Sequence, residues 1–185
     1  MIDDLILALD PGSICSGWAV MDRSERLIEA GILTPDKTGL ASQFRIARMC
    51  EDLIQLLAEW EPGMVVIEWT SGKVVRSRHK GHGAGLAVHG AATGALWQAA
   101  EAWRRALPAE QQNETQILLI TENLWTGGVP KRDRLDGIAA VFNQYNPKND
   151  KTGDMGDAIG LALWHIKERR VQLARYSMQE LATSD

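Results

Sequence analysis

The chain has 185 residues, of which 45% are hydrophobic and 24% charged, and its formal net charge is −4. This balance is ordinary for a globular protein, and the length suits one domain with a sizeable core. The negative charge excludes a protein that is basic throughout. Two cysteines are too few for a disulfide framework or a four-cysteine zinc site. No apolar run approaches the roughly 20 residues of a membrane span.

No signal peptide is recognisable before the first apolar run, so we expect a protein of the cytoplasm, or of the host cytoplasm if the source is viral. We expect residues 1–171 to form a single domain. Residues 172–185 are weakly patterned, which predicts a C-terminal tail that frays.

Three short strands are expected at the start of the chain. Apolar runs at residues 4–10, 15–22 and 26–33 are separated by polar turns, which predicts an antiparallel meander. Apolar residues recur with helical period over 40–60, and a continuous apolar run at 64–68 predicts a strand buried on both faces.

The second half alternates helices, loops and one more strand. We expect a basic, glycine-rich loop at 69–85, an Ala- and Gly-rich helix at 84–107 and a strand at 115–121. A glycine-containing loop at 123–129, a helix at 130–145, a polar linker at 146–152 and a last helix at 154–170 are expected to follow. This order predicts an α/β fold. Its five-stranded mixed sheet combines the meander with two parallel strands added through helical crossovers, and helices flank both faces.

Two carboxylates stand at predicted strand ends. Asp10 ends the first strand, directly before Pro11 and Gly12, and Glu68 ends the fourth. An Asp before Pro-Gly is ordinary turn chemistry, so Asp10 could cap the turn. A buried carboxylate without a partner is costly, so the alternative is that Asp10 binds a cation. If the two strands are parallel neighbours, both carboxylates reach the sheet edge at which ligands bind.

Two more carboxylates, Asp154 and Asp157, are three residues apart at the predicted start of the last helix and share one helical face. They could simply stabilise the helix N-terminus. If they meet Asp10 and Glu68, the four charges repel one another unless a cation neutralises them. Oxygen ligands without Cys or His favour Mg²⁺ or Mn²⁺, and two such ions about 4 Å apart catalyse phosphoryl displacement.

These acidic stretches carry a family resemblance. Leu9–Ser13 with Gly17 following, Val65–Glu68 and Gly153–Ala158 resemble, in this order, the three acidic motifs of RuvC-type Holliday-junction resolvases of the ribonuclease H-like superfamily. The resemblance implies a ribonuclease H-like nuclease domain that cuts DNA with two Mg²⁺ ions, replaceable by Mn²⁺, held by the four acids. It also implies a homodimer that places two sites on a four-way junction, where each nicks one of two opposed strands.

A basic stretch follows Glu68. No acidic residue occurs between Glu68 and Glu101, whereas this interval contains Lys73, Arg76, Arg78 and Lys80. Lys and Arg contacts to phosphates supply most sequence-independent affinity for DNA, so we expect this stretch to bind DNA. The alternative is a solvated surface loop.

Four further residues are candidate DNA contacts. Trp69 and Trp125, in predicted loops beside the site, could stack on an unpaired base or cover the core. Lys131 and Arg132 follow two glycines at a predicted helix start, where backbone N–H groups attract anions. The resemblance makes Lys131 a contact to the scissile strand; otherwise these are exposed charges.

Two other functions remain open. Actin-like and sugar-kinase-like ATPases share the fold and open with an Asp-x-Gly phosphate loop, although they usually need a second such domain. A non-catalytic protein that binds branched DNA would keep the fold without cutting. Metal-dependent nicking of a four-way junction separates these alternatives from a resolvase.

Overall fold

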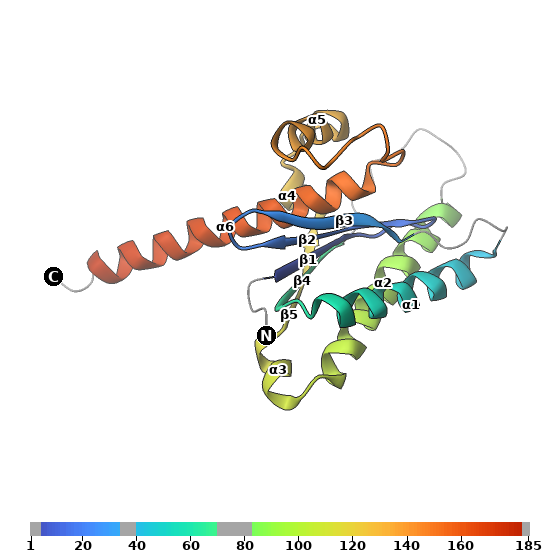
Figure 1. Cartoon of the computed structure of the whole chain (residues 1–185), viewed down its shortest axis with the longest axis horizontal. Coiled ribbons are helices and arrows are strands. Elements are labelled where there is room, and N and C mark those ends of the chain that lie inside the picture. The colour runs from blue at the N-terminus through green and yellow to red at the C-terminus, as the bar shows by residue number, and fades with distance from the viewer. Residues whose placement is uncertain (1–4, 34–39, 70–82, 183–185) are drawn as a thin grey trace.

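The computed structural model describes residues 5–33, 40–69 and 83–182 (Figure 1). Strands β1 (Leu5–Asp10), β2 (Ser16–Asp22) and β3 (Leu27–Leu33) form the predicted antiparallel meander. In the β1–β2 pair, Asp10 lies opposite Gly17.

Two parallel strands complete the sheet. After α1 (Ser42–Trp60), β4 (Met64–Trp69) pairs in parallel with β1. After α2 (Gly83–Ala106) and the short α3 (Ala109–Glu114), β5 (Gln116–Thr121) pairs in parallel with β4. The strand order β3-β2-β1-β4-β5 confirms the predicted five-stranded mixed sheet.

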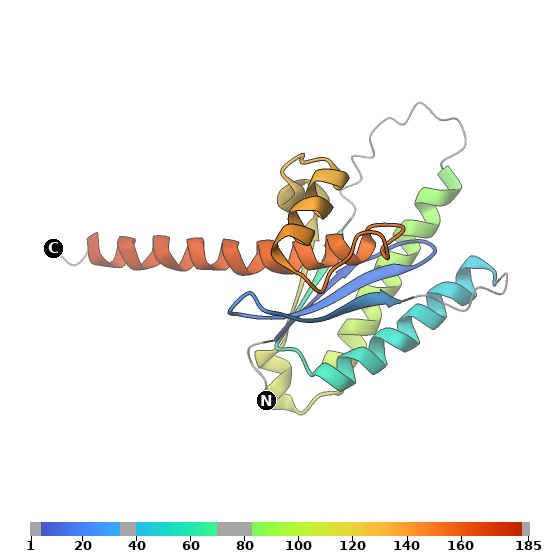
Figure 2. The same cartoon turned by 45° about the horizontal axis from the view of Figure 1, so that its top comes forward.

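The sheet separates two cores, because alternate side chains of a strand point to opposite faces. On β1, Ile6 and Ala8 belong to the core shared with α5 (Lys131–Val141) and α6 (Asp154–Ala182). Leu7 and Leu9 belong to the core that α1 and α2 cover. Figures 1 and 2 show α6 on one side of the sheet and α1 and α2 on the other.

The structure differs from the sequence prediction between β5 and α6. A short helix, α4 (Glu122–Thr126), covers the first part of the loop expected at residues 123–129, and it is followed by Gly127, whose φ of 58° is left-handed. Pro130 is not the first residue of α5 but precedes it, and α5 ends at Val141, earlier than Tyr145.

The last helix was also predicted too short. Instead of ending near residue 170, α6 continues to Ala182 and extends beyond the sheet (Figures 1 and 2). The reason is local: residues 171–182 contain no Gly or Pro and are rich in good helix formers such as Ala, Leu, Gln and Met. Among the helices of the described ranges, none is long and apolar enough to cross a membrane.

Candidate active site

The four predicted acids line one cavity of about 420 Å³ at the carboxyl ends of the parallel strands. Leu9 of β1 pairs with Ile67 of β4, so Asp10 and Glu68, one residue further along each strand, lie at the same sheet edge. The first turn of α6 contributes Asp154 and Asp157 to the cavity. The structure therefore brings together, in one cavity, the four carboxylates that the sequence analysis considered as one site.

A glycine lets the start of α6 approach the sheet closely. A Cβ atom at Gly17 would lie 1.9 Å from the carbonyl oxygen of Asp154, which no packed structure tolerates. Because Gly17 lies opposite Asp10 on β2, this close approach places Asp154 beside Asp10. The glycine after the first acidic motif thus has a packing role at the site.

The N-terminus of α6 is held by Asp150, not by Asp154 or Asp157. The Asp150 carboxylate, which is buried, accepts hydrogen bonds from the backbone N–H groups of Gly153 (3.0 Å) and Gly156 (2.8 Å) and from the Tyr145 hydroxyl (2.9 Å). A carboxylate bonded to the first N–H groups of a helix satisfies donors that have no partner within the helix. Asp154 and Asp157 are therefore not needed as caps.

Asp10 is a buried acid that accepts no hydrogen bond from the described residues. Its side chain is 8% exposed, and no described residue donates a hydrogen bond to it. Burial, and then the charges of Glu68, Asp154 and Asp157, raise the pKa of Asp10 well above its ordinary value. A buried carboxylate in this position calls for a cation.

The Glu68 carboxylate accepts a hydrogen bond from Trp125. The indole Nε1–H of Trp125 on α4 donates to Glu68 Oε2 at 2.7 Å. Burial and the nearby acids Glu122 and Asp157 raise the pKa of Glu68 to about 7, although the Trp125 bond and the charge of Arg134 oppose this rise.

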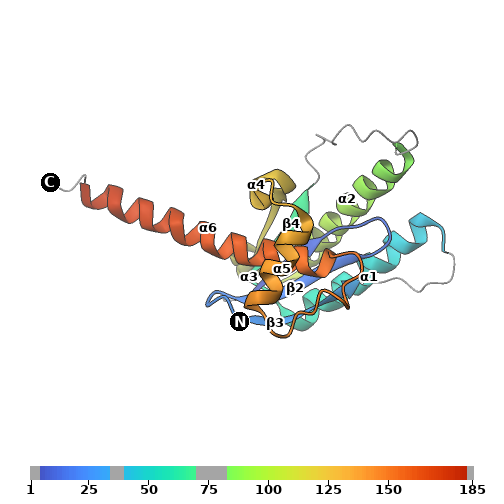
Figure 3. The ribbon, with the colours of Figure 1, turned by 90° about the horizontal axis from the view of Figure 1, so that it is seen from above.

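Two cations of α5 hold the acids of α6. Lys131 Nζ lies 3.1 Å from Asp154 Oδ1 and 3.0 Å from Asp157 Oδ2. Arg134 binds both oxygens of Asp157 at 2.9 and 3.0 Å, and its guanidinium lies 5.0 Å from the centre of the Trp125 ring. Figure 3 shows α5 over the first turns of α6, the arrangement that permits these pairs.

The donor set fits a hard divalent cation. The cavity is lined by five acids, Asp10, Glu68, Glu122, Asp154 and Asp157, against two bases, Lys131 and Arg134, which leaves a formal excess of three negative charges. Within the described ranges, no three His, Cys, Asp or Glu side chains are arranged to hold an ion as they stand. Since Lys131 and Arg134 occupy Asp154 and Asp157, a metal ion would require these pairs to rearrange.

The residues predicted to contact DNA differ in where they lie relative to the cavity. Arg132 has a 90% exposed side chain and lies 3.9 Å from Asp136, away from the cavity lining. Trp69 is the last residue of β4, half-buried, and its ring meets that of Trp97 edge-on at 6.3 Å. Four basic residues after Trp69 that the sequence predicts to bind DNA lie outside the described residues: Lys73, Arg76, Arg78 and Lys80.

Trp125 requires a correction. It is in helix α4, not in a loop, and only 8% of it is exposed, with its N–H bonded to Glu68. The predicted loop position is therefore wrong, and burial leaves little of the ring surface open to a base. Of the two alternatives considered for Trp125, the structure supports the one that places it over the core.

The sequence prediction also missed residues at the site. Glu122 follows β5 directly, while Asp10 is the last residue of β1 and Glu68 the last but one of β4, and this similar position at the strand ends could have revealed it. Arg134 is three residues after Lys131, and this helical spacing places both on one face of α5. The hydrogen bonds of Asp150 and Tyr145 have no comparable pattern in the sequence.

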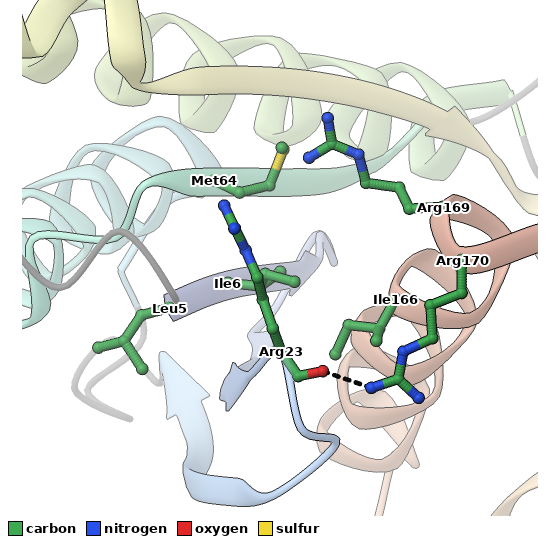
Figure 4. Close-up of a pocket in the computed structure, with 7 residues that line it drawn as sticks. All are labelled: Leu5, Ile6, Arg23, Met64, Ile166, Arg169 and Arg170. Atoms are coloured by element: carbon green, nitrogen blue, oxygen red, sulfur yellow. Dashed lines mark hydrogen bonds between the residues drawn. The ribbon is translucent and has the colours of Figure 1, made fainter. Parts of the chain in front are cut away.

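A second cavity, of about 270 Å³, lies at the opposite ends of β1 and β4 (Figure 4). Apolar side chains, among them Ile6 and Met64, form its floor, and Arg23, Arg169 and Arg170 surround it. Among the described residues that line this cavity none is acidic, whereas the lining of the other cavity supplies carboxylates for a metal ion.

No family model matches the chain, and no curated protein matches it in sequence. Several solved structures, in contrast, match the chain in fold. RuvC of Thermus thermophilus in complex with a Holliday junction substrate matches with a TM-score of 0.63 and 17% identity, over 91% of this chain and 96% of that one. Another Thermus thermophilus RuvC structure gives 0.62 and 16%, with the same coverage.

The yeast mitochondrial Holliday junction resolvase Ydc2 matches with a TM-score of 0.54 and 14% identity, over 94% of this chain and 86% of that one. These matches span nearly the whole described chain, and they agree with the acidic motifs in pointing to one group of structures. The chain therefore has the ribonuclease H-like fold of the RuvC-type resolvases.

Proposed function

We propose that the protein is a Mg²⁺-dependent endonuclease that resolves four-way junctions or other branched DNA by paired nicks. The observation that carries this proposal is Asp10, a buried carboxylate to which no described residue donates a hydrogen bond, in a cavity shared with Glu68, Asp154 and Asp157. The fold supports the choice of DNA, since a structural neighbour is a RuvC in complex with a Holliday junction substrate.

In this proposal Asp10, Glu68, Asp154 and Asp157 hold two Mg²⁺ ions, and Mn²⁺ can replace them. When bound, the ions lower the pKa of the attacking water and neutralise the developing charge on the leaving oxygen. The protein's own contribution is positional. Trp125 fixes the Glu68 carboxylate through its N–H, and the seat of α6 on Gly17 fixes Asp154 against β1.

We propose that the DNA backbone is bound by the basic residues that follow Glu68 in the sequence and by two basic residues of α5: Lys73, Arg76, Arg78, Lys80, Lys131 and Arg132. Such contacts position a protein on DNA without reading its sequence. Trp69 remains a candidate for stacking on an unpaired base. We propose a homodimer, because paired nicks in opposed strands need two sites.

The test is cutting of a synthetic four-way junction by the wild type and by Asp10→Asn. We expect the wild type to nick the junction in Mg²⁺ and not in EDTA. Asp10→Asn should bind the junction equally well and leave it intact, because affinity rests on other residues. Binding without cutting by the wild type would leave the non-catalytic junction binder, and ATP hydrolysis without cutting would support the ATPase.

A further inference from the structure

The carboxylate of Asp157 is fully engaged in the metal-free protein. Oδ1 accepts from Arg134 Nε at 3.1 Å and Nη2 at 2.9 Å, and Oδ2 accepts from Arg134 Nη2 at 3.0 Å and contacts Lys131 Nζ at 3.0 Å. A carboxylate has about four lone-pair sites, so none is left for another ligand. One of the two cations must leave before Asp157 can bind a metal ion.

Arg134 is the more firmly held of the two. Its side chain is 15% exposed, it binds Asp157 through two nitrogens, and its Nη1 also donates to the carbonyl oxygen of Val129 at 2.8 Å. It also stacks on the buried ring of Trp125. A planar guanidinium with several simultaneous partners is a fixed support, because releasing one contact means breaking them all.

Lys131 is held more loosely and in a different place. Its side chain is 41% exposed, and its ammonium makes one contact with each of Asp154 and Asp157. Burial lowers its pKa, but the surrounding acids, Asp157 foremost, outweigh this and keep it charged. Its stem runs over Gly153, where a Cβ atom would lie 2.5 Å from Lys131 Cε.

We propose that the ammonium of Lys131 holds the place of a divalent metal between Asp154 and Asp157, and that metal binding displaces it while Arg134 keeps Asp157 in position. This inference rests on the proposed metal-dependent function, and it adds that Lys131 and the metal ion compete for the carboxylates of Asp154 and Asp157. A lysine is suited to this exchange because its charge is a point on a flexible stem. Once displaced, it stays at the cavity mouth, where the DNA backbone is expected.

The first test is a Mn²⁺ titration, with free Mn²⁺ measured by electron paramagnetic resonance. Lys131→Gln removes the competitor and should bind Mn²⁺ about tenfold more tightly than the wild type, the size expected for a lost bond to a charged group. Lys148→Gln removes the same charge from an exposed lysine in the chain before α6 and should leave the affinity unchanged. Equal affinities of wild type and Lys131→Gln would overturn the inference.

The second test needs no variant. Acetylation of the wild type, mapped by mass spectrometry, should modify Lys131 several-fold faster with saturating Ca²⁺ than with EDTA, because the freed amine enters solvent. Lys148 is the internal control. A Lys131 rate that does not respond to Ca²⁺ would contradict displacement. If the wild type binds no divalent ion, the proposed function itself fails, whereas binding without an effect on Lys131 refutes only the displacement.

Discussion

Asp10 is a buried side chain whose charge the surrounding acids disfavour. It lies among three other acids, with no donor from the described residues, and Lys131 is the cation that most offsets its charge. Sites that keep such a conflict in the metal-free state are typically those at which a ligand resolves it. The same reasoning applies to Glu68 and leads to a prediction about pH.

Metal-free protein should lose stability as the pH rises from 4.5 to about 7. The folded state raises the pKa of Glu68 from 4.5 to about 7, so in this window it keeps a proton that the unfolded chain releases. A shift of this size corresponds to about 3 kcal/mol, and Asp10 acts in the same direction. Urea denaturation in EDTA at pH 5 and pH 8 measures the loss.

Glu68→Gln provides the comparison for that measurement. Because the amide does not titrate, the variant should lose less stability over this interval than the wild type. Wild type and variant curves with the same pH dependence would show that Glu68 is ionised in the metal-free protein throughout.

Trp125→Phe should lower the nicking rate roughly tenfold while junction binding is unchanged. The phenyl ring keeps the packing and the contact with Arg134, but Glu68 loses the N–H that holds it. Trp60→Phe is the matched control, since the buried Trp60 Nε1 has no partner among the described residues. Junction cleavage with the same rate in both variants would remove Trp125 from the site.

At the scale of elements, the close packing of α6 against β2 at Gly17 determines where Asp154 and Asp157 lie. Gly17→Ala should cost about 1–3 kcal/mol and abolish nicking, because the new Cβ meets the Asp154 carbonyl and forces α6 away from β1. Gly137→Ala, on an exposed face of α5 where a Cβ meets nothing within 4 Å, should be neutral or stabilising. Thermal unfolding and junction nicking of both variants measure the difference.

The elements also show what the sequence could predict. Asp10 and Glu68 were expected at one edge if their strands were parallel neighbours, because an apolar run ends on each of them, and the observed pairing of β1 with β4 meets that condition. Helix α4 is only five residues long, and all of it after Glu122 was predicted as part of a loop. The hydrogen bond from Trp125 to Glu68 and the ion pair of Arg134 with Asp157 depend on the orientation of α4 and α5 relative to the sheet. No local sequence pattern predicts that orientation.

At the scale of the whole molecule, the layers of the fold were predictable and its C-terminal end was not. Alternation of strands and helices determines a sheet with helices on both faces, and structural neighbours with 14–17% identity share it. The extension of α6 past the sheet follows from helix propensity rather than from packing, so an argument from apolar periodicity overlooked it.

The central claim is that this fold carries a metal-dependent site which cuts branched DNA in pairs. The most direct measurement uses a supercoiled plasmid that extrudes a cruciform, incubated with the protein in Mg²⁺. Two coordinated nicks across the junction should convert it directly to linear DNA with ligatable 5′-phosphate ends, and Asp10→Asn should leave it supercoiled. A plasmid that stays supercoiled with bound wild-type protein, or linear product that Asp10→Asn forms equally well, would contradict the account.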